Sequence, residues 1–223
     1  MAKQLTILEE GKSYLDITSI DGNVIIYKGA NAPKLKIIKG NAQIFKGGNL
    51  PNLKTVRGNA FIHKGAKVSN LESIGESAEI YPGANVPKLE FVGKSANIYE
   101  GVKVSNLKSI SGWAYIFEGV KAPKLETIGG NAYIHEEVNV KNLKTIGGGA
   151  KIYEGVNVPN LESIGGWAGI EQGANVPKLK SIGKCASIHE RVNAPKLEFI
   201  DGVAKIHPEA NVPKLKFANK KID

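Results

Sequence analysis

The sequence predicts an all-β protein that folds as a single three-sided β-solenoid, or parallel β-helix. An 18-residue unit recurs without insertion or deletion from Asp21 to Ala218, which gives eleven units. Position 6 of the unit is isoleucine in every copy, from Ile26 to Ile206, and position 15 is leucine in every copy. No window shows the i, i+3, i+4, i+7 apolar pattern of a helix. A fixed period of this length is typical of architectures in which each unit stacks on its neighbours.

Each unit holds three short apolar segments, A-x-I at positions 4–6, V-x-V at positions 10–12 and L-x-x-I at positions 15–18. The alternation in the first two segments is the period of a half-buried strand, and Ile and Val favour strands. We therefore expect three short strands per coil, which pair with the adjacent coils around a column of Ile, Leu, Val and Ala. At about 4.8 Å between coils, eleven coils make a rod roughly 50 Å long.

Glycine and proline mark the corners of the coil, with glycines at positions 1, 2 and 9 and proline at position 13 in many units. Glycine supplies a positive φ where the path turns, and proline fixes φ near a bend. Glu137, Arg191 and Glu209 replace the glycine at position 9. We therefore expect the position-9 corner to tolerate ordinary backbone geometry.

The repeat domain spans residues 21–218, and the segments on either side of it differ. In residues 1–20 only part of the apolar pattern persists, as at Leu8 and Ile20. A terminal repeat has no neighbour on its outer face, so we expect residues 1–20 to be a degenerate coil that caps the stack. Residues 219–223 are expected to be a polar C-terminal tail, whose lysines discourage strand addition. A monomer or small oligomer is the expected state.

Stacked coils place like positions directly above one another, so each position forms a column. Position 16 alternates in charge at every step from Glu90 onward, which predicts ion pairs between neighbouring coils. Position 11 is asparagine in eight units and lysine in three, which predicts a ladder of side-chain amides. Both columns favour parallel, in-register stacking independently of the apolar core.

Ile152, Val158 and Ile164 are six residues apart, a spacing that resembles the hexapeptide repeat of left-handed parallel β-helices. The third side departs from that pattern, because Glu162 stands where the hexapeptide unit has a small residue, and the hand of the solenoid stays open. The run L-x-S-I-G-G-x-A within residues 160–168 is similar to short BspA-type leucine-rich-like repeats, which are familiar from bacterial and phage proteins. Hexapeptide enzymes are mostly acyltransferases that use a histidine beside loops thrust out of the coil. The uninterrupted spacing argues against that activity here.

The first candidate site is a column of aromatic residues and histidines at position 7, which contains all four histidines of the chain. Positions 3, 5 and 7 share one outer face, because positions 4 and 6 point inward. This face suits either a ladder of rings that stabilises coil pairing or a binding surface. The column consists of Tyr27, Phe45, His63, Tyr81, Tyr99, Phe117, His135, Tyr153, Glu171, His189 and His207. The residues that we single out for partner binding are Trp113, Tyr115, Phe117, Tyr133, His135 and Trp167.

Glu171, His189 and His207 are consecutive in this column, which raises the question of a metal site. A straight ladder on a flat face does not converge on one ion. We therefore expect a solvated trio, no metal and no cofactor.

The second candidate site is basic. Residues 22–71 hold nine basic residues and no acidic residue. Lysines stack at position 8 in the first three units, and the same position is glutamate in units five to eight. Stacked like charges cost stability, so a nucleic acid or another acidic partner would compensate; the alternative is a solvated basic face that binds nothing. The candidate anion-binding residues are Lys28, Lys46, Arg57, His63, Lys64 and Lys67.

The remaining composition narrows the functional class. One cysteine, Cys185, excludes an internal disulfide framework and suits the cytoplasm, and neither a signal peptide nor a membrane span is visible. Phosphate-binding loops, Ser/His/Asp sets and metal-spaced Cys/His clusters are absent as motifs. We expect a non-enzymatic scaffold for protein–protein interaction through the aromatic face. Anion binding through the first three coils is the alternative, and a hexapeptide-type acyltransferase is the second alternative.

Overall fold

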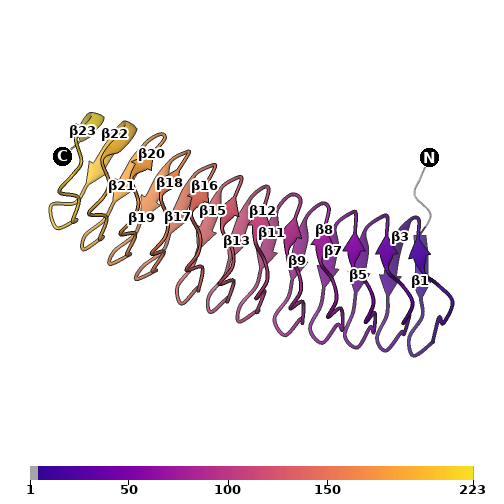
Figure 1. The fold of residues 1–223 in the computed structure, drawn as a ribbon. Helices are drawn as coiled ribbons and strands as arrows, with labels where there is room; N and C mark the ends of the chain where they lie inside the picture. Colours follow the sequence, from indigo (N-terminus) through magenta and orange to yellow (C-terminus); the bar gives the residue numbers. More distant parts are fainter. Residues whose placement is uncertain (1–4, 223) are drawn as a thin grey trace.

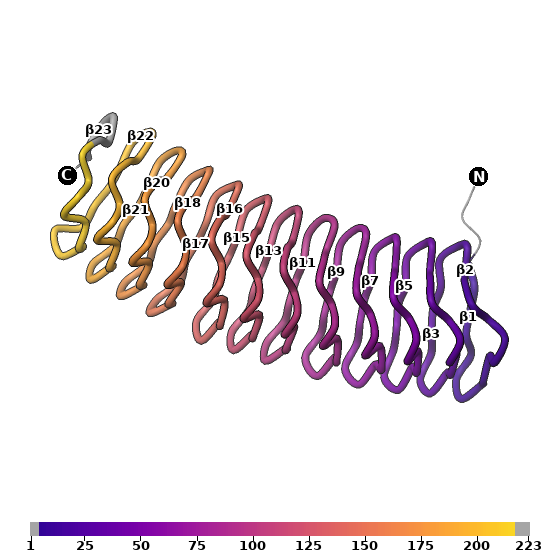
Figure 2. Tube along the Cα trace, viewed as in Figure 1, coloured from indigo at the N-terminus to yellow at the C-terminus, as the bar shows by residue number. Residues whose placement is uncertain are grey.

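The computed structural model describes residues 5–222, with the backbone alone for residues 217–222, and it forms a rod of stacked coils with the two chain ends at opposite ends of the stack (Figures 1 and 2). The predicted all-β solenoid is confirmed. Within residues 5–222 every element is a strand, and the strands form one 23-stranded sheet. All strand pairs are parallel, and the paired residues are 18 apart along nearly the whole stack, as in Ala114↔Ala132.

Two sides of each coil carry strands. The A-x-I segments form the first side, whose strands are β3 (Asn23–Ile26), β5 (Ala42–Ile44), β7 (Ala60–Ile62), β9 (Ala78–Ile80), β11 (Ala96–Ile98), β13 (Ala114–Ile116), β15 (Ala132–Ile134), β17 (Ala150–Ile152), β19 (Ala168–Ile170) and β21 (Ala186–Ile188). The ends of the L-x-x-I segments form the third side, whose strands are β4 (Ile37–Ile38), β6 (Thr55–Val56), β8 (Ser73–Ile74), β10 (Phe91–Val92), β12 (Ser109–Ile110), β14 (Thr127–Ile128), β16 (Thr145–Ile146), β18 (Ser163–Ile164) and β20 (Ser181–Ile182). Strand β22 (Phe199–Ile206) runs through a corner and belongs to both sides.

The second side is reduced to a single bridge per coil at position 11, as in Asn175↔Asn193. The side-chain amides of this position form the predicted ladder at four of the five adjacent asparagine pairs; at the fifth pair, Asn139 Oδ1 instead accepts from the Lys141 N–H. Asn193 Nδ2 donates to Asn175 Oδ1 at 2.7 Å, and Asn49 Nδ2 donates to Asn31 Oδ1 at 2.8 Å. The amides therefore reinforce the side on which the backbone pairs least.

The core is one continuous apolar column along the rod. In the coil at 147–164, Ala150, Ile152, Val158 and Leu161 are fully buried, and no polar or charged residue is buried in the part of the chain whose side chains are described. The regular Ile, Leu, Val and Ala positions thus give each coil an interior that matches the interior of the next coil, which fixes the register.

Both ends of the stack add to the repeat domain. Residues 5–20 complete one further coil, in which β1 (Leu5–Leu8) pairs with β3 and β2 (Ser19–Ile20) pairs with β4. At the other end, the expected polar tail at 219–223 is wrong over residues 219–222, because β23 (Phe217–Ile222) pairs with β22 with a one-residue register shift. The unpaired backbone edge of β22 provides the donors and acceptors for this strand. Asp223 and residues 1–4 lie outside the described residues.

Two different physical constraints explain why glycine occupies the corners of the coil. At position 9 the glycines have φ between 65° and 76°, and Glu137 and Arg191 adopt the same left-handed conformation, with φ of 54° and 56°. The expectation of ordinary geometry at these two residues is therefore wrong, because in-register stacking imposes the path of the neighbouring coils. At position 1 the cause is close packing: a Cβ on Gly147 would lie 3.1 Å from the carbonyl carbon of Gly129 in the preceding coil.

The predicted charge ladder at position 16 is present. Lys108 pairs with Glu90 at 2.7 Å, and equivalent pairs join later coils at 2.9 Å, in each case between residues 18 apart. These pairs are about half exposed, so each contributes only about 0–1 kcal/mol. Their main effect is on register, because a slip of the stack would place like charges together.

Candidate functional site

The first side of the solenoid carries an uninterrupted column of eight stacked rings at position 7. Adjacent ring centroids are 4.1–5.7 Å apart, and the ring planes differ by at most 16°. Because this spacing is close to the distance between paired strands, each coil adds one ring in van der Waals contact with the last. The eight rings, which we call the ring column, are Tyr27, Phe45, His63, Tyr81, Tyr99, Phe117, His135 and Tyr153.

A second set of rings lies beside the ring column in the later coils. Tyr115 stacks on Tyr133 with centroids 4.5 Å apart, and Trp167 meets Tyr133 edge-on at 6.2 Å. Trp113 is 50% exposed, whereas the other residues of the predicted partner-binding set are half-buried. The structure therefore brings the six predicted residues onto one face, and Trp113 presents the most accessible apolar surface among them.

Gly149 is a residue of this patch that the sequence analysis did not identify. A Cβ on Gly149 would lie within 2.6 Å of the Trp167 ring, so the absence of a side chain makes room for the indole. Gly130 plays the same part for Trp113, whose Cδ1 lies 2.5 Å from the Cβ position of that glycine. The sequence held one sign of both contacts, because each of these two glycines is one coil away from the tryptophan that it accommodates.

The titratable groups in the ring column are adapted to stacking. Burial lowers the pKa of His63, and burial also lowers the pKa of His135 although Glu136 opposes the shift. Both imidazoles are therefore neutral at pH 7 and stack as uncharged rings. The Tyr81 hydroxyl donates to Glu79 Oε2 at 2.6 Å, and this hydrogen bond raises the pKa of Tyr81 to about 12.

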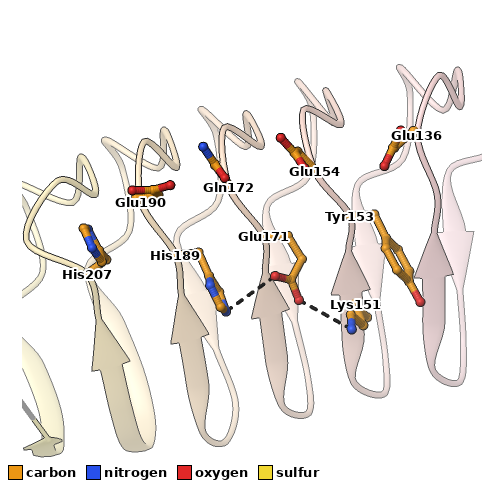
Figure 3. Close-up of a pocket in the computed structure, with 9 residues that line it drawn as sticks. All are labelled: Glu136, Lys151, Tyr153, Glu154, Glu171, Gln172, His189, Glu190 and His207. Atoms are coloured by element: carbon orange, nitrogen blue, oxygen red, sulfur yellow. Dashed lines mark ion pairs between the residues drawn. The ribbon is translucent and has the colours of Figure 1, made fainter.

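The ring column ends at Tyr153, and a shallow hollow of about 460 Å³ begins there (Figure 3). Glu171 occupies position 7 of the next coil and lies between the Lys151 ammonium group and the His189 imidazole, with its carboxylate oxygens 3.5 Å from Lys151 Nζ and 3.5 Å from His189 Nε2. The Lys151 Nζ lies 4.9 Å from the centroid of Tyr153. Glu171 is thus held between Lys151 and His189 along the ladder, and His207 lies one coil further on (Figure 3). No group of three or more metal-ligating side chains comes together within residues 5–222.

The predicted anion-binding residues do not form one cluster. Lys28, Lys46 and Lys64 stack at position 8 beside the ring column, which includes His63. In contrast, Lys67 lies on the second side, where it bridges Asn49 and Asn85, and Arg57 is at the corner that follows β6. The candidate basic site is therefore a row of three lysines along one edge of the first side.

The environments of these three lysines differ. Lys28 Nζ is 3.8 Å from Glu10 Oε1 in the capping coil. The Cγ atoms of Lys46 and Lys64 lie 3.4 Å and 3.1 Å from the Cβ positions of Gly65 and Gly83 in the next coil. The stems of these two lysines therefore follow the corner, and their ammonium groups make no ion pair with the described residues.

The same edge becomes acidic further along the rod. Position 8 is glutamate in coils five to eight, and the described part of the chain offers none of these carboxylates an ion pair. Glu136 and Glu154 line the hollow at the end of the ring column together with Tyr153, so positions 7 and 8 share one surface (Figure 3). The acidic residues are Glu100, Glu118, Glu136 and Glu154.

Comparison with protein-family models, curated proteins and solved structures finds no match for this chain. None of the elements described between residues 5 and 222 is a helix long and apolar enough to cross a membrane.

Proposed function

We propose that this protein is a non-enzymatic scaffold that binds a protein partner through the first side of the solenoid. The observation that carries the proposal is the continuous aromatic surface, in which the ring column is flanked by Trp113, Tyr115, Tyr133 and Trp167. Aromatic residues are enriched at the centres of protein interfaces. Stacked rings have already lost most of their rotamer freedom in the free protein, so binding costs little further entropy.

The test is capture of a partner by variants of the exposed aromatic residues. Trp113→Ala and Tyr133→Ala should abolish partner capture and leave the circular dichroism spectrum unchanged. Phe91→Ala is the matched control, because Phe91 is 40% exposed on the third side and its removal should leave capture intact. Full capture by the Trp113→Ala and Tyr133→Ala variants would refute the proposal.

The second candidate function is binding of a polyanion, with nucleic acid first, along the lysine row. The observation in its favour is that Lys46 and Lys64 lie at coil spacing along one edge and make no ion pair with the described residues, which leaves their ammonium groups available to phosphates. Binding to single-stranded nucleic acid should then weaken steeply between about 50 mM and about 200 mM salt. Absence of binding at the lower salt concentration, or binding that does not respond to salt, would remove this candidate.

Cys185 is exposed and makes no disulfide. A free exposed thiol is best preserved in a reducing compartment, and this supports our proposal that the protein acts in the cytoplasm.

A further inference from the structure

The charge of the position-8 edge is divided between the two halves of the ring column. Coils one to three carry lysines, coil four carries Pro82, and coils five to eight carry glutamates. Stacking like charges at coil spacing is unfavourable, and Lys46, Lys64 and the four glutamates make no ion pair with the described residues. A partner that compensates this edge must offer both charges in the opposite order and at the same spacing.

We propose that the partner of the first side is a second copy of this chain, packed antiparallel about a two-fold axis between coils four and five. This inference rests on the proposed function and identifies its partner. Coil n of one copy then faces coil 9 − n of the other. The facing pairs at position 8 are Lys28 with Glu154, Lys46 with Glu136 and Lys64 with Glu118, and each pair occurs twice because the interface is isologous.

The ring column independently gives the same axis. It spans coils one to eight, so its midpoint lies between Tyr81 and Tyr99. A two-fold axis that runs along the strand direction reverses the order of the coils and leaves each column opposite itself. The ring column of one copy therefore lies on the ring column of the other over its whole length. At position 5 the same axis brings Phe61 opposite Tyr115.

A parallel arrangement of the two copies does not place the position-8 lysines opposite glutamates. A two-fold axis along the rod would exchange the two edges of the first side, so that position 8 of one copy would lie far from position 8 of the other. The lysines would then gain no carboxylates. The charge pattern therefore selects the antiparallel arrangement.

The contact area is sufficient for a stable dimer. Eight coils at about 4.8 Å give a length of about 38 Å, and positions 3 to 8 at about 3.3 Å per residue give a width of about 17 Å. The product is about 650 Å² per copy, or about 1,300 Å² in total, which is at the lower end of specific interfaces. Neutral His63 and His135 face phenylalanines across the axis. Close to the axis, Glu79 is held by the hydrogen bond from Tyr81, and Glu100 faces Pro82 at the edge, where it stays open to solvent.

Sedimentation equilibrium of the full chain tests the self-association. We expect a dimer at about 100 μM protein, because dimerisation follows concentration. A chain with Lys28→Glu, Lys46→Glu and Lys64→Glu should dimerise about a hundredfold more weakly. A chain with Glu118→Lys, Glu136→Lys and Glu154→Lys should be weakened similarly. An equimolar mixture of the two variants should form a heterodimer, because every facing pair is again of opposite charge.

Cross-linking tests the register with only one of the facing charges removed in each chain. In a Cys185→Ser background, a Lys46→Cys chain and a Glu136→Cys chain should be joined by a short bismaleimide only when they are mixed. Two Lys46→Cys chains should not be joined, because coils two and seven are about 24 Å apart along the rod.

Three results would overturn the inference: a monomer at about 100 μM wild-type protein, a mass that charge reversal does not change, or efficient cross-linking of Lys46→Cys to itself. A monomeric wild-type protein that captures another protein, and loses that capture with Trp113→Ala, would overturn the two-fold dimer and leave the proposed function standing.

Discussion

Gly93 occupies position 1 of the fifth coil, where the chain passes closest to the coil before it. Its φ is not in the left-handed region, so backbone freedom does not explain why glycine is found there. A Cβ at Gly93 would lie 2.8 Å from the carbonyl carbon of Gly75, and still nearer to the carbonyl oxygen of that residue. Because these atoms are backbone, no side-chain rotation can relieve the clash, and Gly93→Ala must separate two coils.

The expected loss of stability follows from these contacts. Overpacking against a rigid neighbour costs about 1–3 kcal/mol. The Gly93 N–H donates to the Ile74 carbonyl at 2.8 Å, and weakening of that bond adds about 0.5–1.5 kcal/mol. The sum is a destabilisation of about 1.5–4.5 kcal/mol. At a urea m-value of about 2 kcal/mol/M, the unfolding midpoint should fall by about 1–2 M.

Gly169→Ala is the matched control, with the opposite sign. Gly169 is the central residue of β19, and a Cβ there would meet nothing nearer than Trp167 at 3.9 Å. Alanine should raise stability by about 0.5–1 kcal/mol, because glycine in a strand costs that much entropy. Urea titrations followed by both circular dichroism and tryptophan fluorescence measure the two effects. Equal midpoints for the two variants, or a loss of stability with Gly169→Ala, would refute the close-packing explanation.

Three further predictions concern the corners, the histidines and the charge ladder. Glu137→Gly should stabilise the protein by about 0.5–1 kcal/mol, because φ of 54° is unfavourable for an L-residue, and a lower melting temperature in calorimetry would contradict this. Burial lowers the pKa of both His63 and His135, so as the pH falls the unfolded chain binds protons at these histidines before the folded chain does. Their contribution to stability should therefore be fully present above about pH 6.5 and should decrease towards pH 5. The double variant His63→Phe, His135→Phe should show a shallower fall in the urea midpoint over that range, and an unchanged slope would count against the stacked neutral imidazoles. Lys144→Ala removes the 2.9 Å pair with Glu126 and should cost less than about 1 kcal/mol; a larger loss in the same titration would mean that the ladder stabilises the stack far more than exposed pairs do.

The repeat alone was enough to predict the parallel solenoid, its core and its columns. In-register stacking makes every position of the unit a column, so Ile152 predicts the environment of Ile134 and Ile170. The same reasoning gave the capping coil, the amide ladder, the charge ladder at position 16 and the outward direction of the rings. These features depend only on the period and on the side of the chain to which each residue points.

The tertiary structure decided what depends on contacts between coils. The left-handed φ at Glu137 is imposed by the path of adjacent coils, and the Trp167 ring lies over Gly149 because that glycine leaves space. The strand at 217–222 forms because β22 leaves a backbone edge unpaired. Lys46 follows the corner beside Gly65 and makes no ion pair with the residues described between 5 and 222, whereas Glu171 lies between Lys151 and His189. A linear pattern specifies which column a side chain joins, but rotamers and the spacing of the coils determine which atom it meets.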